Sequence, residues 1–440
     1  MPAPLPHAYG PVTGMVTVPG DKSISHRAAL FGLIASGPCR ASGWLDCADT
    51  RASLAAVQAL GAQVSVTGGV LRVTPPAAAA AAPLTIDCKN SGTTARLLTG
   101  LLAGWLPVGA AGVVLEGDAS LSRRPMNRLV GPLRAMGADI SWLGEPGRLP
   151  LRVGGAALVG VEHHLEVASA QVTSALLLAG LFARGRTAVT GAARARDHTE
   201  ILLNTMGVSC AQESSSPGTG VRGPAALGAF DIRVPGDPSS AAFFQAAAAL
   251  VPGSRLVVPD QSLNPTRIGA LQVLRQAGAE VRIEPGPGAA GAEPAGKVTV
   301  SHKVLNPFTI TEQDIPSLVD EIPVLAVLAT QAAGVTRITG ARELRVKESD
   351  RLAVMADNLN RLGADVAERE DGLVITGPTP LAGGRPGDPL VMTTAGDHRV
   401  AMALAVAALV AAGETVLDDE ACVAVSYPYF FKTLAELLRP

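Results

Sequence analysis

The chain has 440 residues, too many for one ordinary core, and its length predicts two globular domains. Hydrophobic residues make up 48% but aromatic residues only 3%, so we expect cores of tightly packed aliphatic helices and strands. The 36 Lys and Arg residues nearly balance the 38 Asp and Glu residues, and the net charge is -2. A chain without excess positive charge and with so few rings for stacking on bases is not expected to bind nucleic acid.

The N-terminus, the apolar runs and the cysteines exclude further classes. MPAPLPHAYGPV has neither a basic start nor an apolar core, so we expect no secretion signal and a cytoplasmic protein. The longest apolar run, Val400 to Ala412, has about 13 residues where a membrane span needs roughly 20, and it predicts a buried helix. CxxC and Cys/His spacings are absent, which argues against disulfides and zinc and predicts buried free thiols at Cys39, Cys47, Cys88, Cys210 and Cys422.

One unit occurs six times along the chain: a polar turn, an Ala/Leu-rich helix, then glycine and a short strand. The spacing of roughly 65 to 85 residues suits a βαβαββ module with two helices. The six helices are expected to begin near Lys22, Ser91, Gln171, Pro238, Asp320 and Asp397. The second helix of five modules is expected to stop at a glycine, in LGAQV (Leu60), MGADI (Met136), MGVSC (Met206), AGAEV (Ala277) and LGADV (Leu362).

Two similar phrases, VPGDKSISHRAAL from Val18 and VPGDPSSAAFFQA from Val234, relate the halves of the chain to each other. We expect each VPGD to mark a crossing between domains. One domain is predicted at residues 21–235, inserted into a discontinuous domain made of residues 1–20 and 236–440, with three repeats in each. Low-complexity stretches from Pro75 and from Pro285 are expected to be surface loops between modules.

The first module opens its helix with Asp21-Lys22-Ser23 and continues to Arg27. Lys22, Ser23 and the free N–H groups of the first turn point toward the same helix end, which makes an anion site. A capped surface helix with solvated charges is the plain alternative.

The second module offers Gly92, which lets a ligand approach the backbone closely, and Thr93, which can donate a hydroxyl. Pro125 suits the first turn of a helix, so Arg124 is expected just before a helix start. A forked guanidinium there could hold a carboxylate or a phosphate. In the third module Ser169 and neighbouring residues could be helix caps and nothing more.

In the fifth module Asp320 precedes an apolar helix, and Glu348 lies in the charged run from Lys347 to Arg351. Taken singly, these are typical of a helix cap and a solvated helix face. Because most modules place a cation or a hydroxyl at the start of an apolar helix, we expect the starts to converge on one cleft, which would suit two multiply charged anions. The cations expected there are Lys22, Arg27, Arg124, Arg196, Lys347, Arg351 and Arg399.

The chain resembles the enolpyruvyl transferase family over nearly its whole length. The phrases that carry the resemblance, in the family's order, are GDKSISHRA, NSGTTARLL, SAQVTSA, RDHTE, VPGDPSSAAFF, NPTR, DEIP, KESDR and GDHRVAMA. The resemblance implies an α/β fold of two similar domains, each of three βαβαββ repeats forming an inside-out barrel, with the active site in the interdomain cleft. It implies no metal or organic cofactor, small-molecule substrates, no membrane partner, and a monomer.

The branch that the chain resembles transfers the enolpyruvyl group of phosphoenolpyruvate to the 5-hydroxyl of shikimate 3-phosphate, on the route to chorismate and aromatic amino acids. Carried over by motif, shikimate 3-phosphate would meet Lys22, Ser23, Arg27, Ser169, Ala170, Gln171, Arg196, Asp320 and Lys347. Phosphoenolpyruvate would meet Lys22, Gly92, Arg124, Gln171, Arg351 and Arg399. Addition of an alcohol to an enol ether needs a base at the hydroxyl and an acid at the methylene carbon, for which Asp320 and Glu348 are expected. Lys22 would neutralise charge throughout.

Three residues depart from the family's pattern. Ala195 stands where Ser or Thr is frequent, Val425 stands where one branch has a phosphoenolpyruvate-binding Lys, and Ala170 replaces a Ser of that branch. Gly92 is the small residue that in the family leaves room for the inhibitor glyphosate, so inhibition by glyphosate is expected.

Three alternatives stay open. The sister enzyme that uses UDP-N-acetylglucosamine usually carries Lys-Asn near the start and a loop Cys, whereas here Lys22 is followed by Ser23 and no Cys lies between Cys88 and Cys210. An RNA-end cyclase would need a nucleophilic His and a nucleotide site. A non-catalytic anion-binding protein of the same fold is the third, and the presence of Lys22, Asp320 and Glu348 argues against it.

Overall fold

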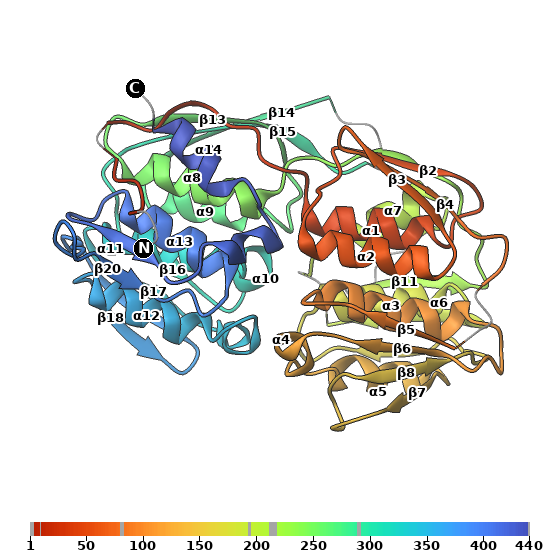
Figure 1. Cartoon of the computed structure of the whole chain (residues 1–440). Helices are drawn as coiled ribbons and strands as arrows, with labels where there is room; N and C mark the ends of the chain where they lie inside the picture. Colours follow the sequence, from red (N-terminus) through yellow and green to blue (C-terminus); the bar gives the residue numbers. More distant parts are fainter. Residues whose placement is uncertain are drawn as a thin grey trace. The chain divides into compact units, whose positions relative to one another are not determined.

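The computed structural model describes residues 4–8, 10–79, 83–191, 195–210, 218–287 and 292–438. It divides into two compact units (Figure 1). Unit 1 comprises Met1–Pro19, Pro235–Gly288 and Pro294–Pro440, and unit 2 comprises Gly20–Val234 and Ala289–Glu293. The chain therefore leaves unit 1 within the first VPGD sequence and returns to it within the second.

Unit 2 forms three sheets within the described ranges, with strand orders β12-β2-β4-β3, β5-β6-β8-β7 and β11-β10-β9. Their strands are β12 (Asp231–Arg233), β2 (Cys39–Ser42), β4 (Val70–Thr74), β3 (Gln63–Thr67), β5 (Leu84–Asp87), β6 (Val113–Glu116), β8 (Leu151–Gly154), β7 (Asp139–Trp142), β11 (Gly218–Gly223), β10 (Gly185–Thr190) and β9 (Glu162–His164).

Unit 1 also forms three sheets among its described residues, with orders β1-β13-β15-β14, β16-β17-β19-β18 and β20-β21. Their strands are β1 (Thr13–Met15), β13 (Arg255–Ser262), β15 (Ala295–Ser301), β14 (Glu280–Pro285), β16 (Thr309–Ile310), β17 (Gly334–Ile338), β19 (Gly372–Gly377), β18 (Asp365–Arg369), β20 (Leu390–Met392) and β21 (Thr415–Leu417).

The sheets repeat one pairing pattern. β5 runs parallel to β6, with Leu84 opposite Val113, and β6, β8 and β7 then pair antiparallel. β16, β17, β19 and β18 pair in the same way. The two shorter sheets keep the parallel pair, β9 with β10 and β20 with β21. Parallel strands need a crossover connection, and a helix supplies it in each case. The predicted α/β fold of repeated modules is confirmed, with the third module of each unit short of strands among the described residues.

The crossover helices form the centre of each unit, where they contact one another. They are α1 (Lys22–Gly32), α3 (Gly92–Trp105) and α6 (Ala170–Gly180) in unit 2, and α8 (Pro238–Leu250), α11 (Ile322–Thr330) and α13 (His398–Ala408) in unit 1. Each begins within two residues of its predicted start. All residues of α8, α11 and α13 are buried, as expected for helices that are apolar on every face.

The second helix of each module has exposed residues, unlike the fully buried α8, α11 and α13. These helices are α2 (Ala48–Ala59), α5 (Asn127–Ala135), α7 (His198–Thr205), α9 (Gly269–Gln276), α12 (Arg351–Arg361) and α14 (Phe430–Leu437), with the short α4 (Ala119–Ser122), α10 (Ile315–Leu318), η1 (Arg342–Val346) and η2 (Ala421–Val425) in the connections. The predicted glycine stops are confirmed, since all five glycines have positive φ: Gly61, Gly137, Gly207, Gly278 and Gly363.

Close contact between helices depends on small residues. A Cβ on Gly100 of α3 would lie 2.2 Å from the backbone oxygen of Ala175 in α6, a distance that no real Cβ reaches. The backbones of α3 and α6 therefore approach each other closely at Gly100, where no side chain separates them. An Ala-rich, aromatic-poor sequence permits such close packing.

Two sequence expectations need correction. The stretch from Pro285 does not separate modules, because it links β14 to β15 within one sheet; its residues 288–291, like residues 80–82 of the stretch from Pro75, lie outside the described residues. Cys210 is only half-buried, whereas the other four free cysteines are buried. Within the described residues, none of the helices combines the length and the apolar character that crossing a bilayer requires.

Candidate functional site

The start of α1 carries the first predicted cation. Asp21 caps the helix by accepting a hydrogen bond from Ile24 N at 3.0 Å, and Lys22 follows it. Lys22 Nζ lies 2.9 Å from Asp49 Oδ2 on α2, with 16% of the lysine side chain and 11% of the aspartate side chain exposed. Asp49, which the motifs did not single out, therefore holds a partly desolvated ammonium group beside the free N–H groups of the helix start.

Arg27, one turn further along α1, is buried and held by uncharged oxygens. Nε donates to Thr199 Oγ1 at 2.7 Å, Nη1 to Ser23 O at 3.0 Å and Nη2 to Ser174 Oγ at 2.6 Å. Burial lowers the pKa of Arg27 to about 10, although the charge of Glu200 opposes this shift. Arg27 stays cationic at neutral pH, and its hydroxyl partners leave it suited to an anionic ligand.

Glu200 of α7 is a buried acid that the sequence did not assign. Desolvation and the neighbouring Asp197 raise the pKa of Glu200 to about 7, while the charge of Arg27 acts in the opposite direction. Its Oε2 is buried without a hydrogen-bond partner among the described residues. Glu200 therefore carries only part of its charge at neutral pH and compensates Arg27 incompletely.

The start of α3 presents backbone rather than side chain. Ser91 caps it by accepting from Thr94 N at 3.2 Å, and Gly92 is its first residue. A Cβ on Gly92 would lie 2.5 Å from Nη1 of Arg96 and 3.5 Å from Nη1 of Arg124. Two guanidinium groups thus approach this helix start in the space that the missing side chain leaves.

Gln171 joins the starts of α6 and α3. Its Nε2 donates to Thr93 Oγ1 at 3.0 Å, and its Oε1 accepts from Arg96 Nη1 at 3.0 Å. Ser169 caps α6 by accepting from Val172 N at 3.4 Å. Ala170 is the first residue of α6. Ala195 and Arg196 are half-buried in the connection before α7. Gln171 is therefore more than a helix cap.

Arg124 is not placed by a helix start as predicted. α5 begins at Asn127 after the N-cap Met126, so Pro125 precedes the helix and Arg124 lies in the connection from α4. Pro125 fixes a backbone angle that connections also use, so this proline did not mark the first turn of a helix. Arg124 Nη2 instead donates to Asn90 Oδ1 at 2.7 Å, which ties Arg124 to the turn before α3.

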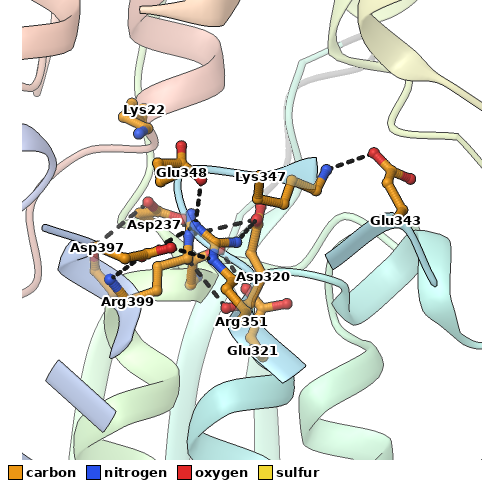
Figure 2. Close-up of polar contacts among 12 residues, drawn as sticks. Lys22, Asp237, Asp320, Glu321, Glu343, Lys347, Glu348, Arg351, Asp397 and Arg399 are labelled. Carbon is orange, nitrogen blue, oxygen red and sulfur yellow. Dashed lines mark hydrogen bonds and ion pairs between the residues drawn. The ribbon is translucent and has the colours of Figure 1, made fainter. Parts of the chain in front are cut away.

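In unit 1, Arg351 lies at the centre of a cluster of carboxylates (Figure 2). Its Nε lies 2.8 Å from Asp397 Oδ2, its Nη2 lies 2.7 Å from Glu348 Oε2, and its Nη1 lies 3.3 Å from Asp320 Oδ1. Only 1% of the Arg351 side chain is exposed. Burial alone would lower the pKa of Arg351, but the charges of Asp397, Glu348 and Asp320 outweigh it and raise that pKa.

Arg399 and Lys347 extend this cluster. Arg399 Nε lies 3.4 Å from Asp320 Oδ1, and Arg399 is 6% exposed. Lys347 Nζ donates to Glu343 one helical turn before it, as Figure 2 shows. The run from Lys347 to Arg351 is not a solvated helix face, because it connects η1 to α12 and ends on the buried Arg351.

A second polar network lies at the starts of α8 and α11. Arg267 Nη2 donates to Asp237 Oδ1 at 2.9 Å and to Ser239 Oγ at 3.0 Å, and Ser239 Oγ donates to Glu321. All four side chains are buried. The NPTR, VPGD and DEIP phrases thus meet in one network, whose last member adjoins Asp320 in the chain.

Each unit therefore brings together its own share of the predicted residues. In unit 2 these are Lys22, Ser23, Arg27, Gly92, Arg124, Ser169, Ala170, Gln171 and Arg196, and in unit 1 they are Asp320, Lys347, Glu348, Arg351 and Arg399. The unit 2 set is mostly cationic or hydroxylic and can bind oxyanions, whereas the unit 1 set couples cations to carboxylates and can also move protons. Val425 is half-buried in η2 and brings no cation.

Sequence reasoning missed several partners of these residues: Asp49, Arg96, Ser174, Thr199, Asp237 and Asp397. Asp237 and Asp397 could have been suspected from their place just before an apolar helix. The other four have no local signal, because their contacts join separate elements. Among the described residues, no group of three or more His, Cys, Asp or Glu is arranged to hold a metal ion.

Comparison with known proteins gives one family. The family whose model matches the chain is EPSP synthase (3-phosphoshikimate 1-carboxyvinyltransferase), over residues 6–434. A protein of Anaeromyxobacter sp. (strain K) named 3-phosphoshikimate 1-carboxyvinyltransferase is 49% identical over 432 residues, covering 98% of this chain and 95% of its own. A protein of the same name from Shouchella clausii is 43% identical and covers 98% of each chain.

Solved structures agree with this match. EPSP synthase from Acinetobacter baumannii has a TM-score of 0.82 and 37% identity, covering 99% of this chain and 97% of its own. The enolpyruvyl transferase NikO from Streptomyces tendae, at 20% identity and a TM-score of 0.76 over 99% and 98% of the two chains, shares the fold.

Proposed function

The chain belongs to the EPSP synthase (3-phosphoshikimate 1-carboxyvinyltransferase) family, and from this premise we propose which of its residues carry the reaction. The enzyme transfers the enolpyruvyl group of phosphoenolpyruvate to the 5-hydroxyl of shikimate 3-phosphate and releases phosphate, a step of the shikimate pathway. We propose that units 1 and 2 are its two functional domains, that both contribute to one reaction, and that it works as a cytoplasmic monomer.

The reaction is an addition followed by an elimination. The 5-hydroxyl oxygen bonds to C2 of phosphoenolpyruvate, its proton leaves to a base, and an acid gives a proton to C3, so that a tetrahedral intermediate forms with a methyl group. Loss of one methyl proton and departure of phosphate then restore the double bond. The protein must neutralise two phosphates and two carboxylates and must handle two protons.

For shikimate 3-phosphate we propose the contacts Lys22, Ser23, Arg27, Ser169, Ala170, Gln171 and Arg196 from unit 2 and Asp320 and Lys347 from unit 1. Arg27 supports this assignment best, because its buried guanidinium is held by hydroxyls and keeps a charge that a phosphate can balance. Ser174 and Thr199 would then orient Arg27 rather than touch the substrate.

For phosphoenolpyruvate we propose Lys22, Gly92, Arg124 and Gln171 together with Arg351 and Arg399. The helix start at Gly92, which has no side chain and is approached by the guanidinium of Arg124, supports a phosphate position there. Arg351 and Arg399 supply the fixed positive charge that a carboxylate needs. Val425 provides no cation, so Arg124 and Arg399 would carry the charge that a lysine supplies elsewhere in the family.

Asp320 is the proposed base and Glu348 the proposed acid, and both contact Arg351. A guanidinium 2.7 Å from Glu348 favours the ionised carboxylate, which opposes an acid role. Binding of the phosphoenolpyruvate carboxylate to Arg351 would resolve this conflict, because it competes for the same N–H group and frees Glu348 to take up a proton. Phosphoenolpyruvate would thereby make Glu348 the acid that protonates C3 of its double bond.

The observation that carries the proposal is the contact of one buried arginine with both candidate proton-transfer carboxylates. The test is phosphate release from purified protein with phosphoenolpyruvate, comparing shikimate 3-phosphate with UDP-N-acetylglucosamine as the acceptor. We expect release with shikimate 3-phosphate and none with the sugar nucleotide. Release with neither would favour a non-catalytic binding protein, and glyphosate is expected to inhibit the reaction.

A further inference from the structure

A row of hydrogen bonds connects α1, α2 and α3 inside unit 2. His26 Nδ1 lies 2.8 Å from Ser53 Oγ, Ser53 Oγ lies 2.7 Å from Thr94 Oγ1, and Thr94 Oγ1 lies 2.7 Å from Ser91 Oγ. Ser91 is the N-cap of α3 and accepts a further bond from the backbone of Thr94. The row therefore begins one turn after Lys22 and ends beside Gly92.

The row is completely buried. His26, Ser53, Thr94 and Ser91 each have 0% exposure. Hydroxyl groups removed from water are unfavourable unless their bonds are satisfied, so these three partners hold one another strongly. Burial and the charges of Lys22 and Arg27 lower the pKa of His26 well below its ordinary value, which keeps the imidazole neutral and able to join the row.

The three elements that the row connects carry different proposed contacts. α1 supplies Lys22, and α2 supplies the Asp49 that holds Lys22 at 2.9 Å. α3 supplies the backbone of its first residue, Gly92, which has no side chain. A buried row of directional hydrogen bonds specifies the relative position of the three helix starts in addition to the apolar packing.

We propose that Thr94 and Ser53 are positioning residues for phosphoenolpyruvate, which set the start of α3 at Gly92 against Lys22 on α1. This inference rests on the proposed contacts of phosphoenolpyruvate with Lys22 and Gly92. Arg27, Ser174 and Thr199 form a separate hydrogen-bonded group, so the proposed contact of shikimate 3-phosphate with Arg27 does not depend on the start of α3.

The test replaces Thr94 by valine, which keeps the shape and removes the hydroxyl. We expect the KM for phosphoenolpyruvate to rise about tenfold, because the Thr94 hydroxyl makes two bonds of the row, one to Ser53 and one to Ser91. The dissociation constant of shikimate 3-phosphate, measured by calorimetry without phosphoenolpyruvate, should change by less than about twofold. Thr94→Ser restores the hydroxyl and should return the KM to the wild-type value.

Thr99 provides a matched control on the same helix. It is also 0% exposed, but its hydroxyl donates to Ala95 O within α3, so Thr99→Val should leave both constants unchanged. Ser53→Ala breaks the row at the next bond and should reproduce the effect of Thr94→Val, and the double variant should be no worse than either single variant. These variants also decide the matter if Thr94→Val is too unstable to study.

Equal kinetics for Thr94→Val and Thr99→Val, or an equal weakening of both substrates, would overturn the inference. The proposed substrate contacts are tested separately by Arg124→Ala. If that variant raises the KM for phosphoenolpyruvate while Thr94→Val does not, the contacts stand and the positioning role fails. If neither variant changes the KM, the contacts themselves are wrong.

Discussion

The carboxylate of Asp397 binds the guanidinium of Arg351, accepting a hydrogen bond from Nε at 2.8 Å and another from Nη2 at 3.3 Å. Both residues are buried, with an exposed fraction of 0% for Asp397 and 1% for Arg351. The same carboxylate caps α13 through Arg399 N. One side chain thus fixes both arginines that we assign to the carboxylate of phosphoenolpyruvate.

Asp397→Asn should therefore destabilise the protein. Asparagine caps a helix as well as aspartate does, but the buried guanidinium loses a full negative charge, and we expect a loss of about 2–4 kcal/mol in the free energy of unfolding. Urea denaturation measures it. Asp350→Asn is the control, because Asp350 also caps a helix but pairs with Arg345 in a partly exposed bridge, and it should cost less than about 1 kcal/mol. Equal losses would mean that burial of the pair of Asp397 and Arg351 adds nothing to the effect of losing a partly exposed charge pair.

Asp320→Asn should abolish turnover without abolishing binding. An amide cannot accept the hydroxyl proton, and we expect kcat to fall by at least about a hundredfold, while shikimate 3-phosphate binds within a few-fold of wild type. Phosphate release and calorimetry measure the two quantities. Asp314→Asn, at a nearby turn where Asp314 bonds Thr311, should keep full activity. An Asp320→Asn variant with wild-type kcat would remove Asp320 from the mechanism.

Gly92→Ala should weaken phosphoenolpyruvate and glyphosate together. The added methyl group would lie 2.5 Å from Arg96 Nη1, so either the guanidinium or the ligand must move. We expect the KM for phosphoenolpyruvate and the glyphosate concentration for half inhibition each to rise about tenfold or more, with shikimate 3-phosphate binding little changed. A variant in which both values stay at the wild-type level would show that Gly92 faces neither ligand.

The pH dependence of stability should reveal Glu200. Burial raises the pKa of Glu200 from 4.5 to about 7, so the folded protein binds this proton more tightly than the unfolded chain does. The stability that it contributes is complete below pH 4.5 and is lost as the pH rises through about 7. Glu200→Gln should therefore gain about 2–3 kcal/mol over wild type between about pH 5 and pH 8.

Urea denaturation of the wild type and the Glu200 variant across this pH range makes the comparison. Glu162→Gln is the control, because the Glu162 side chain is 79% exposed in its bridge to Arg186, and its difference from wild type should not vary with pH. A flat difference for Glu200→Gln would place its pKa at an ordinary value.

Gly100→Ala should destabilise unit 2. The added Cβ would meet the backbone of Ala175 at 2.2 Å, and separation of α3 from α6 is expected to cost about 1–3 kcal/mol. Gly131 of α5 offers the opposite case, because a methyl group added there would have no atom within 4 Å and the residue is exposed within a helix. Gly131→Ala should change the melting temperature little, because the higher helix propensity of alanine is opposed by Pro132, which disfavours helical backbone at the residue before it. Similar melting temperatures for the two variants would contradict the close packing.

The helices and their starts could be predicted because their signals are local. An apolar run after a capping residue predicts a buried helix, and glycine at its far end predicts the stop, as at Leu60-Gly61. The helix expected at Pro125 was misplaced because proline also fits a connection. The cluster around Arg351 has no local signal, since its partners Asp320 and Asp397 lie 31 and 46 residues away in the chain. Only the fold brings such residues together.

The strand order has a consequence for how the chain folds during its synthesis. β12 pairs with β2, and the paired residues are 191 positions apart in the chain. β1 pairs with β13, whose residues lie 242 positions further along the chain. A chain leaving the ribosome can pair the described strands of unit 2 as soon as β12 has emerged, although Ala289–Glu293 of that unit follow later. Of the described strands of unit 1, only β1 has been made at that point. β1 must wait, unpaired, until β13 is made. Closure of such long loops is slow, so synthesis itself sets the order in which the two halves fold.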